Sequence, residues 1–99
     1  MIRGTTPTLR FTLPFDTAEV AALYITIDQT HLVTVEKSLA DCTLVGSTVS
    51  FRLTQEDTLK LVQSVPAQIQ VRLKTTDGTA MASNVFETPV EKILKEGAI

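Results

Sequence analysis

Apolar and polar residues alternate along most of this chain. Successive side chains of a β-strand point to opposite faces of the sheet, so a period of two residues indicates a strand with one buried face. The segment TLRFTLP, at residues 8–14, places Leu9, Phe11 and Leu13 on one face. Pro14 ends this predicted strand, because proline cannot donate a hydrogen bond to a neighbouring strand.

Several later segments alternate in the same way and are separated by residues that favour turns. Gly46 and the Asp77-Gly78 pair suit tight turns, and the turn-like segment DQTH separates two of the runs. The predicted strands lie at 20–28, 32–37, 47–53 and 67–75, with a shorter one around 42–44. The residues expected to face the core are Leu23, Ile25, Ile27, Val33, Val35, Val49, Phe51, Leu53, Ile69, Val71 and Leu73.

The end of the chain is less regular. A final strand is predicted at 80–90, where strict alternation fails near Val85 and Phe86. Such a failure indicates either a β-bulge or burial on both faces. Residues 90–99 are expected to form either a short helix, because their apolar residues have helical spacing, or a loose tail.

One segment, TQEDTLKL, has helical character. Thr54 is placed to cap a helix, while Glu56 and Asp57 fall in its first turn, where negative charge is favourable. The Thr54–Asp57 spacing resembles a capping box with Asp in place of the usual Glu or Gln. Pro66 prevents the helix from continuing into the next strand. We therefore predict a short helical crossover near 54–62 that serves as a structural corner between sheets.

These elements predict one domain that spans residues 1–99. Six or seven short strands separated by turns favour an all-β fold, and two packed sheets bury their apolar faces. Length and spacing suit an immunoglobulin-like two-sheet antiparallel β-sandwich, although the chain lacks the cysteine pair and the tryptophan of antibody domains. A small barrel is the alternative, and the strand order stays open.

Composition narrows the classes of function. The chain has 99 residues, 43% of them hydrophobic, which is enough for one core but not for a second domain. No apolar run approaches the roughly 20 residues that cross a bilayer, and the first residues lack the apolar core of a signal peptide. A net charge of -2 offers no general attraction to nucleic acid or anionic lipid. We expect a soluble protein.

Few residues could carry chemistry. Glu56 and Asp57 are adjacent in the predicted helix, so their carboxylates point about 100° apart and cannot act on one substrate atom. Cys42 and His31 could form a nucleophile pair, with Asp41 beside the thiol. The simpler interpretation is a small apolar cysteine next to a turn and a solvated histidine. A single cysteine and a single histidine exclude an internal disulfide and the usual zinc ligands, so no cofactor is predicted.

A set of basic and aromatic residues falls on the outward parity of the predicted strands. If these side chains gather, they form a surface that can bind an acidic protein or a sugar. Outward lysine and arginine also serve simply to keep sheet faces and edges soluble. The predicted interaction face consists of Arg10, Tyr24, Arg52, Arg72 and Lys74.

The segments MIRGTTPTLRFTLPFD, LTQEDTLKL and IQVRLKTTDGTAMASNVFETPV lie at the start, in the middle and near the end of the chain. Their sequences resemble those of small proteins encoded in prophages of Gram-positive bacteria, near tail and baseplate genes. The resemblance runs from Met1 to about Lys95, contains no catalytic signature and carries over no functional residue. One departure is DQTHLVT, where a glycine-containing hairpin turn is expected, so the hairpin is expected to be longer here.

The resemblance implies a setting rather than an activity. Phage tails and baseplates repeat small β-sandwich modules that make symmetric contacts. We therefore expect a non-enzymatic structural or protein-interaction module of a (pro)phage particle, associated with the tail or baseplate. Its expected partners are other phage structural proteins or further copies of itself, in the bacterial cytoplasm or in the virion. The alternative is a carbohydrate-binding module, which the absence of Trp and the single Tyr disfavour.

Overall fold

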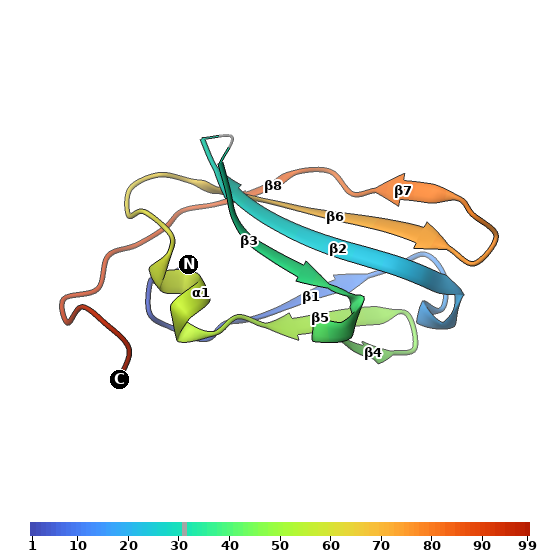
Figure 1. Cartoon of the computed structure of the whole chain (residues 1–99), viewed down its shortest axis with the longest axis horizontal. Helices are drawn as coiled ribbons and strands as arrows, with labels where there is room; N and C mark the ends of the chain where they lie inside the picture. Colours follow the sequence, from blue (N-terminus) through green and yellow to red (C-terminus); the bar gives the residue numbers. More distant parts are fainter. Residues whose placement is uncertain (31) are drawn as a thin grey trace.

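The computed structural model describes residues 1–30 and 32–99, and it describes Val33 by its main chain alone. Two antiparallel sheets lie face to face (Figure 1). The small sheet has the order β1-β5-β4, and the large sheet has the order β3-β2-β6-β7, with β8 also paired to β6. The strands are β1 (Thr8–Thr12), β2 (Val20–Gln29), β3 (Leu32–Ser38), β4 (Thr43–Val45), β5 (Thr48–Arg52), β6 (Ala67–Thr75), β7 (Ala80–Ala82) and β8 (Phe86–Thr88).

This strand order corresponds to that of an immunoglobulin domain without its first strand. Immunoglobulin domains place strands A, B, E and D in one sheet and G, F and C in the other, and variable domains add C′ beside C. Here β1-β5-β4 takes the places of B-E-D, and β7-β6-β2-β3 takes those of G-F-C-C′. No strand among the described residues takes the place of A. The predicted two-sheet sandwich is confirmed, and the barrel alternative is excluded because the sheets are separate.

The structure has eight strands in the described part of the chain, not six or seven, because a bulge divides the last predicted one. Arg72 of β6 pairs with Ala82 of β7, whereas Ile69 pairs with Phe86 of β8. Three steps along β6 therefore match four steps along the outer strand, which leaves one extra residue there. This extra residue explains the loss of alternation near Val85, and of the two interpretations the bulge is correct.

The core lies between the sheets and consists of the inward residues of the alternating runs. Leu23, Ile25, Ile27, Val49 and Leu53 are at most 1% exposed. Full burial of one such aliphatic side chain stabilises the fold by about 1.5–3 kcal/mol. The other buried hydrophobic residues are Val20, Val35, Phe51, Leu61, Ala67, Ile69, Val71, Leu73 and Val90, while Leu9, Phe11 and Leu13 are only partly buried. The prediction for Val33 falls outside the described side chains.

A short helix, α1 (Gln55–Leu59), connects β5 of the small sheet to β6 of the large one. The Thr54 hydroxyl accepts a hydrogen bond from the Asp57 N–H at 3.1 Å, and the Asp57 carboxylate accepts one from the Thr54 N–H at 2.9 Å. This capping box satisfies two main-chain donors at the helix start. The predicted crossover and its cap are therefore confirmed. Two 3-10 helices, η1 (Thr17–Glu19) and η2 (Leu39–Asp41), complete the structure.

Long-range contacts hold both ends of α1 in place. The Arg3 guanidinium donates to the carbonyl of Leu59 at 3.1 Å and to that of Leu61 at 2.8 Å. A cation at this end of a helix compensates for its unsatisfied carbonyl groups. On the other side, the Asp57 carboxylate lies 2.9 Å from the Lys37 ammonium of β3. Both contacts tie this crossover to distant parts of the sequence.

The hairpin between β2 and β3 is shorter than expected from DQTHLVT, a segment that lacks a glycine-containing turn. Gln29 ends β2 and pairs with Leu32, the first residue of β3. Only two residues therefore connect the strands. Thr30 takes a φ of 52°, in the left-handed region that usually favours glycine. The expectation of a longer hairpin is wrong, because a threonine here adopts the conformation that a glycine was expected to supply.

Residues 90–99 contain no helix. Instead, Ile2 forms a parallel bridge with Glu91, and the Glu91 N–H donates to the Met1 carbonyl at 2.8 Å. Beyond this bridge, Leu94 is 93% exposed and Ile99 is 95% exposed. The short helix is therefore not formed. The segment is irregular, and it contacts the domain through the Arg3–Glu96 ion pair at 2.7 Å and the hydrogen bond from the Ile99 N–H to the Gln55 amide oxygen at 2.8 Å.

Candidate functional site

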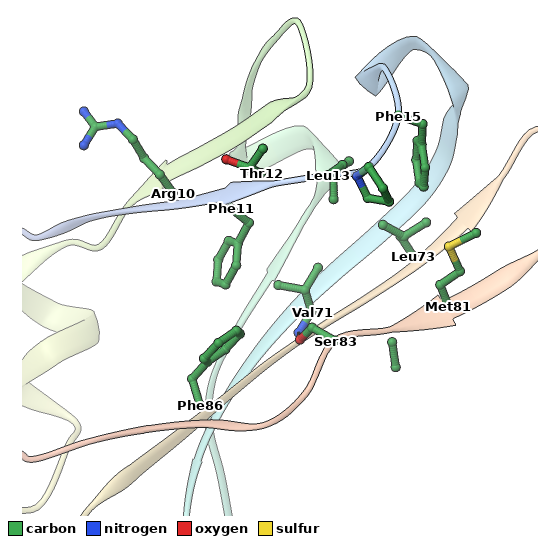
Figure 2. Close-up of a pocket in the computed structure, with 12 residues that line it drawn as sticks. Arg10, Phe11, Thr12, Leu13, Phe15, Val71, Leu73, Met81, Ser83 and Phe86 are labelled. Atoms are coloured by element: carbon green, nitrogen blue, oxygen red, sulfur yellow. Dashed lines mark hydrogen bonds between the residues drawn. The ribbon is translucent and has the colours of Figure 1, made fainter.

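On one side of the sandwich, β1 borders the small sheet and β7 and β8 border the large one (Figure 1). A groove lined by residues of these strands and of β6 lies between the sheets there. It encloses about 410 Å³. Figure 2 shows the ring of Phe11, from β1, and that of Phe86, from β8, on opposite walls of this space. Val71 and Leu73 of β6 form its floor. A second hollow of about 260 Å³, between Leu9 and Ile69, continues the groove along β1. The groove is thus apolar and elongated.

The groove exists because the two sheets differ in width. The small sheet is three strands wide, whereas the large one is four strands wide if β7 and β8 are counted as one position. Phe86 and Met81 pair with the inward residues Ile69 and Leu73, so they share the inward face of the large sheet. They are nevertheless 50% and 40% exposed. These two side chains have core parity but no strand of the small sheet above them.

The main chain of β1 is open along the groove. The Leu13 N–H donates to the Ser47 carbonyl at 2.8 Å, and the Leu53 N–H donates to the Pro7 carbonyl at 2.9 Å. Antiparallel strands exchange both hydrogen bonds at every second residue pair. The odd-numbered residues of β1 therefore bond to β5. The peptide groups of Thr8, Arg10 and Thr12 point the other way, to the open side.

An aromatic contact spans the groove. The Phe11 ring stacks on that of Phe51 with centroids 6.1 Å apart, and it meets the Phe86 ring at the same separation and a 46° tilt. Aromatic pairs at this distance attract beyond the effect of area burial alone. This contact fixes the spacing between β1 and β8. The hydroxyl of Ser83, at the bulge, is engaged by the Val71 N–H at 3.0 Å.

The predicted interaction face is divided between the two outer surfaces of the sandwich. Arg10 and Arg52 lie on the exposed face of the small sheet, with Arg52 bonded to the Thr6 hydroxyl at 2.9 Å. Tyr24, Arg72 and Lys74 lie on the exposed face of the large sheet, and Tyr24 pairs directly with Arg72. Outward parity alone does not assign a strand to a sheet. The five residues therefore do not form one patch, and only Arg10 borders the groove.

Among the described residues, the candidate catalytic side chains have separate surroundings. Burial raises the pKa of the Cys42 thiol, and the charge of Asp41 raises this pKa further, so the thiolate is disfavoured. The Asp41 carboxylate accepts a hydrogen bond from the Ser38 N–H at 2.9 Å and caps η2. His31 lies outside the described residues. Glu56 is exposed and Asp57 is buried against Lys37. Across the described ranges, no three His, Cys, Asp or Glu side chains are grouped to bind a metal ion.

The sequence does not predict the groove, although one apolar residue that lines it is visible in the predicted last strand. Met81 is an apolar residue in the predicted last strand, but its inward facing is set by its pairing with Leu73. Phe86 follows the bulge, so its facing could not be counted from the residues before it. The sequence of β1 does not show that it is an edge strand, because an edge strand and a central strand can have the same alternation.

We expect the exposed aromatic wall of the groove to bind hydrophobic dyes in the folded protein. Phe86→Ser should reduce the fluorescence of bound anilinonaphthalene sulfonate by more than half and lower the free energy of unfolding by only about 1 kcal/mol, because half of this side chain is already in water. Val45→Ser is the matched control, since Val45 is exposed on β4, away from the groove. Equal dye binding by both variants would show that the groove is not the apolar site.

No helix in the described part of the chain has the length and apolar character needed to span a membrane. No family model, no curated protein and no solved structure matches this chain.

Proposed function

We propose that this protein is a non-enzymatic structural or protein-interaction module of a (pro)phage particle, associated with the tail or baseplate. The observation that carries the proposal is the apolar groove beside the open edge of β1. Soluble monomers rarely expose large contiguous apolar patches, and such patches mark interaction sites. The groove is a place where another protein can bind.

The chemistry of the groove supports binding rather than catalysis. Its lining is mainly aliphatic and aromatic, and its polar members are Arg10, Thr12 and Ser83. The described lining residues include no histidine, cysteine or carboxylate beside these three, so they supply no acid–base pair or activated nucleophile. An open strand edge, by contrast, offers main-chain groups that a second chain can pair with.

The phage setting rests on the resemblance of the three sequence segments to prophage proteins encoded near tail and baseplate genes. A small sandwich with an open edge strand suits such particles, because they are built from many repeated contacts between modules. Other phage structural proteins are the proposed partners, and further copies of this chain are the second candidates.

The proposal is tested by affinity capture from the bacterium that carries the gene. The tagged protein is expressed with and without prophage induction, and chemically cross-linked partners are identified by mass spectrometry. We expect tail or baseplate proteins of the same prophage to be enriched only after induction. A tagged sandwich domain of equal size from the host serves as the control. Equal recovery on both baits, or no phage protein at all, would contradict the proposed function.

A further inference from the structure

We infer that the groove accepts an extended, acidic segment of a partner protein as a fourth strand of the small sheet, next to β1. The inference rests on the proposed function and specifies the chemistry of the partner at the same site. Three independent features of the groove define this occupant: its main-chain groups, its apolar hollows and the charge at its rim.

The main-chain groups require an extended segment. Thr8, Arg10 and Thr12 direct their peptide groups to the open side, and every strand pair of both sheets is antiparallel. A segment of about five residues, about 4.8 Å from β1, satisfies these groups by continuing the ladder. It occupies the place of strand A in an immunoglobulin domain and makes the two sheets equal in width.

The apolar hollows specify alternate hydrophobic side chains. The hollows of about 410 and 260 Å³ lie on either side of the Phe11–Phe86 contact. Side chains two residues apart in a strand point to the same face, so one segment can place apolar residues in both hollows. Those side chains would cover Met81 and Phe86, which no strand of the small sheet covers.

The charge at the rim specifies the other side chains. The strands of the small sheet carry two charged residues, Arg10 and Arg52, and both face outward. Arg10 makes no hydrogen bond or ion pair with any described residue. The outward positions of an added strand lie beside Arg10, and opposite charges at such cross-strand positions attract. The partner segment is therefore acidic on its outer face.

The same charge argues against a second copy of this chain as the occupant. Antiparallel pairing of two β1 strands over their full length, through their open groups, places one Arg10 opposite the other. Like charges directly opposite each other destabilise a strand pair. A different protein with an acidic strand avoids this repulsion and gains attraction instead.

A peptide-binding experiment tests the inference. The probe is a fluorescein-labelled nine-residue peptide in which valine alternates with glutamate, and the comparison peptide replaces glutamate with lysine. We expect saturable binding of the glutamate peptide by fluorescence polarisation, with a Kd below about 1 mM. Arg10→Glu should weaken this binding by about three- to tenfold and strengthen binding of the lysine peptide. Arg72→Glu, the same change on the other outer face, should leave both affinities unchanged.

Main-chain pairing is tested with the wild-type protein, so the result does not depend on a variant that folds poorly. In an antiparallel pair, the amide groups of the glutamate positions face β1. Methylating those nitrogens should abolish binding, whereas methylating one terminal valine nitrogen should not. In the complex, hydrogen exchange at the amides of Thr8, Arg10 and Thr12 should slow by more than tenfold.

Several outcomes would overturn the inference. The inference fails if the glutamate peptide does not bind or if both peptides bind equally. It also fails if binding survives methylation of the glutamate nitrogens. A wild-type dimer that Met81→Asp dissociates, without peptide binding, would assign the groove to a second copy instead. If phage proteins are captured equally by wild type and Met81→Asp, the inference about the groove fails while the proposed function stands.

Discussion

Replacing Gln29 with leucine is expected to lower the free energy of unfolding by about 3 kcal/mol. Gln29 is 5% exposed at the end of β2. Its amide nitrogen donates to the carbonyls of Val62 and Val65, each at 2.9 Å, and its amide oxygen accepts from the Val62 N–H at 2.8 Å. Leucine keeps the volume but leaves three main-chain groups without a partner. Each lost hydrogen bond costs about 1 kcal/mol.

This loss is measured by urea denaturation, followed by circular dichroism at pH 7. Gln63→Leu is the matched control, because Gln63 is exposed in the same loop and makes no hydrogen bond to a described residue. The control should stay within about 0.5 kcal/mol of wild type. A loss below about 1 kcal/mol for Gln29→Leu would mean that water replaces the glutamine amide, and that the loop after α1 does not depend on it.

Asp57→Ala is expected to cost about 3 kcal/mol, because Asp57 has two roles. It completes the capping box of α1, which contributes about 1 kcal/mol. It also pairs with the Lys37 ammonium at 2.9 Å, where the Lys37 side chain is only 20% exposed. Removing one partner of a largely buried pair leaves the other charge poorly solvated, so the loss exceeds that of a surface ion pair.

A double-mutant cycle separates the two roles. Lys37→Met removes the ammonium but keeps most of the apolar stem, and it should cost less than Asp57→Ala because the cap survives. The double variant should be more stable than the sum of the two losses predicts, by about 1–2 kcal/mol. Glu56→Ala, an exposed change in the same turn, is the control and should cost under about 1 kcal/mol. Strict additivity would contradict the ion pair.

The same carboxylate makes stability depend on pH. Burial by itself raises the pKa of Asp57, but the hydrogen bonds from Lys37 and Thr54 outweigh burial and hold this pKa below its ordinary value of 3.8. A carboxyl group with a lowered folded-state pKa stabilises the fold above its unfolded pKa, and the contribution is lost as the pH falls through the folded pKa. Below about pH 5, stability should therefore fall more steeply in wild type than in Asp57→Ala. If the free energy of unfolding fell equally with pH in both proteins, the role of the Asp57 carboxylate would be contradicted.

The site itself was only partly predictable. Arg10 has outward parity and borders the groove, but Tyr24 and Arg72 have the same parity and lie on the opposite surface of the molecule. Two polar residues at inward positions were visible in the sequence, and both make buried contacts in the structure. Gln29 and Lys37 occupy inward positions of apolar runs, and a polar side chain at such a position needs a buried partner. Alternation cannot tell which partner that is, because both partners lie in the segment around α1, far along the sequence.

The sequence by itself determined where the chain is extended, which face of each regularly alternating strand is buried and where α1 begins. These are local properties: side-chain alternation follows from main-chain geometry, and Thr54 caps a helix with a residue three positions away. The tertiary structure alone decided which strands are neighbours, and hence that β1 is an edge with Phe86 exposed across from it. Strand order depends on the combined packing of all inward side chains and on the unequal width of the two sheets, and no short segment encodes either quantity.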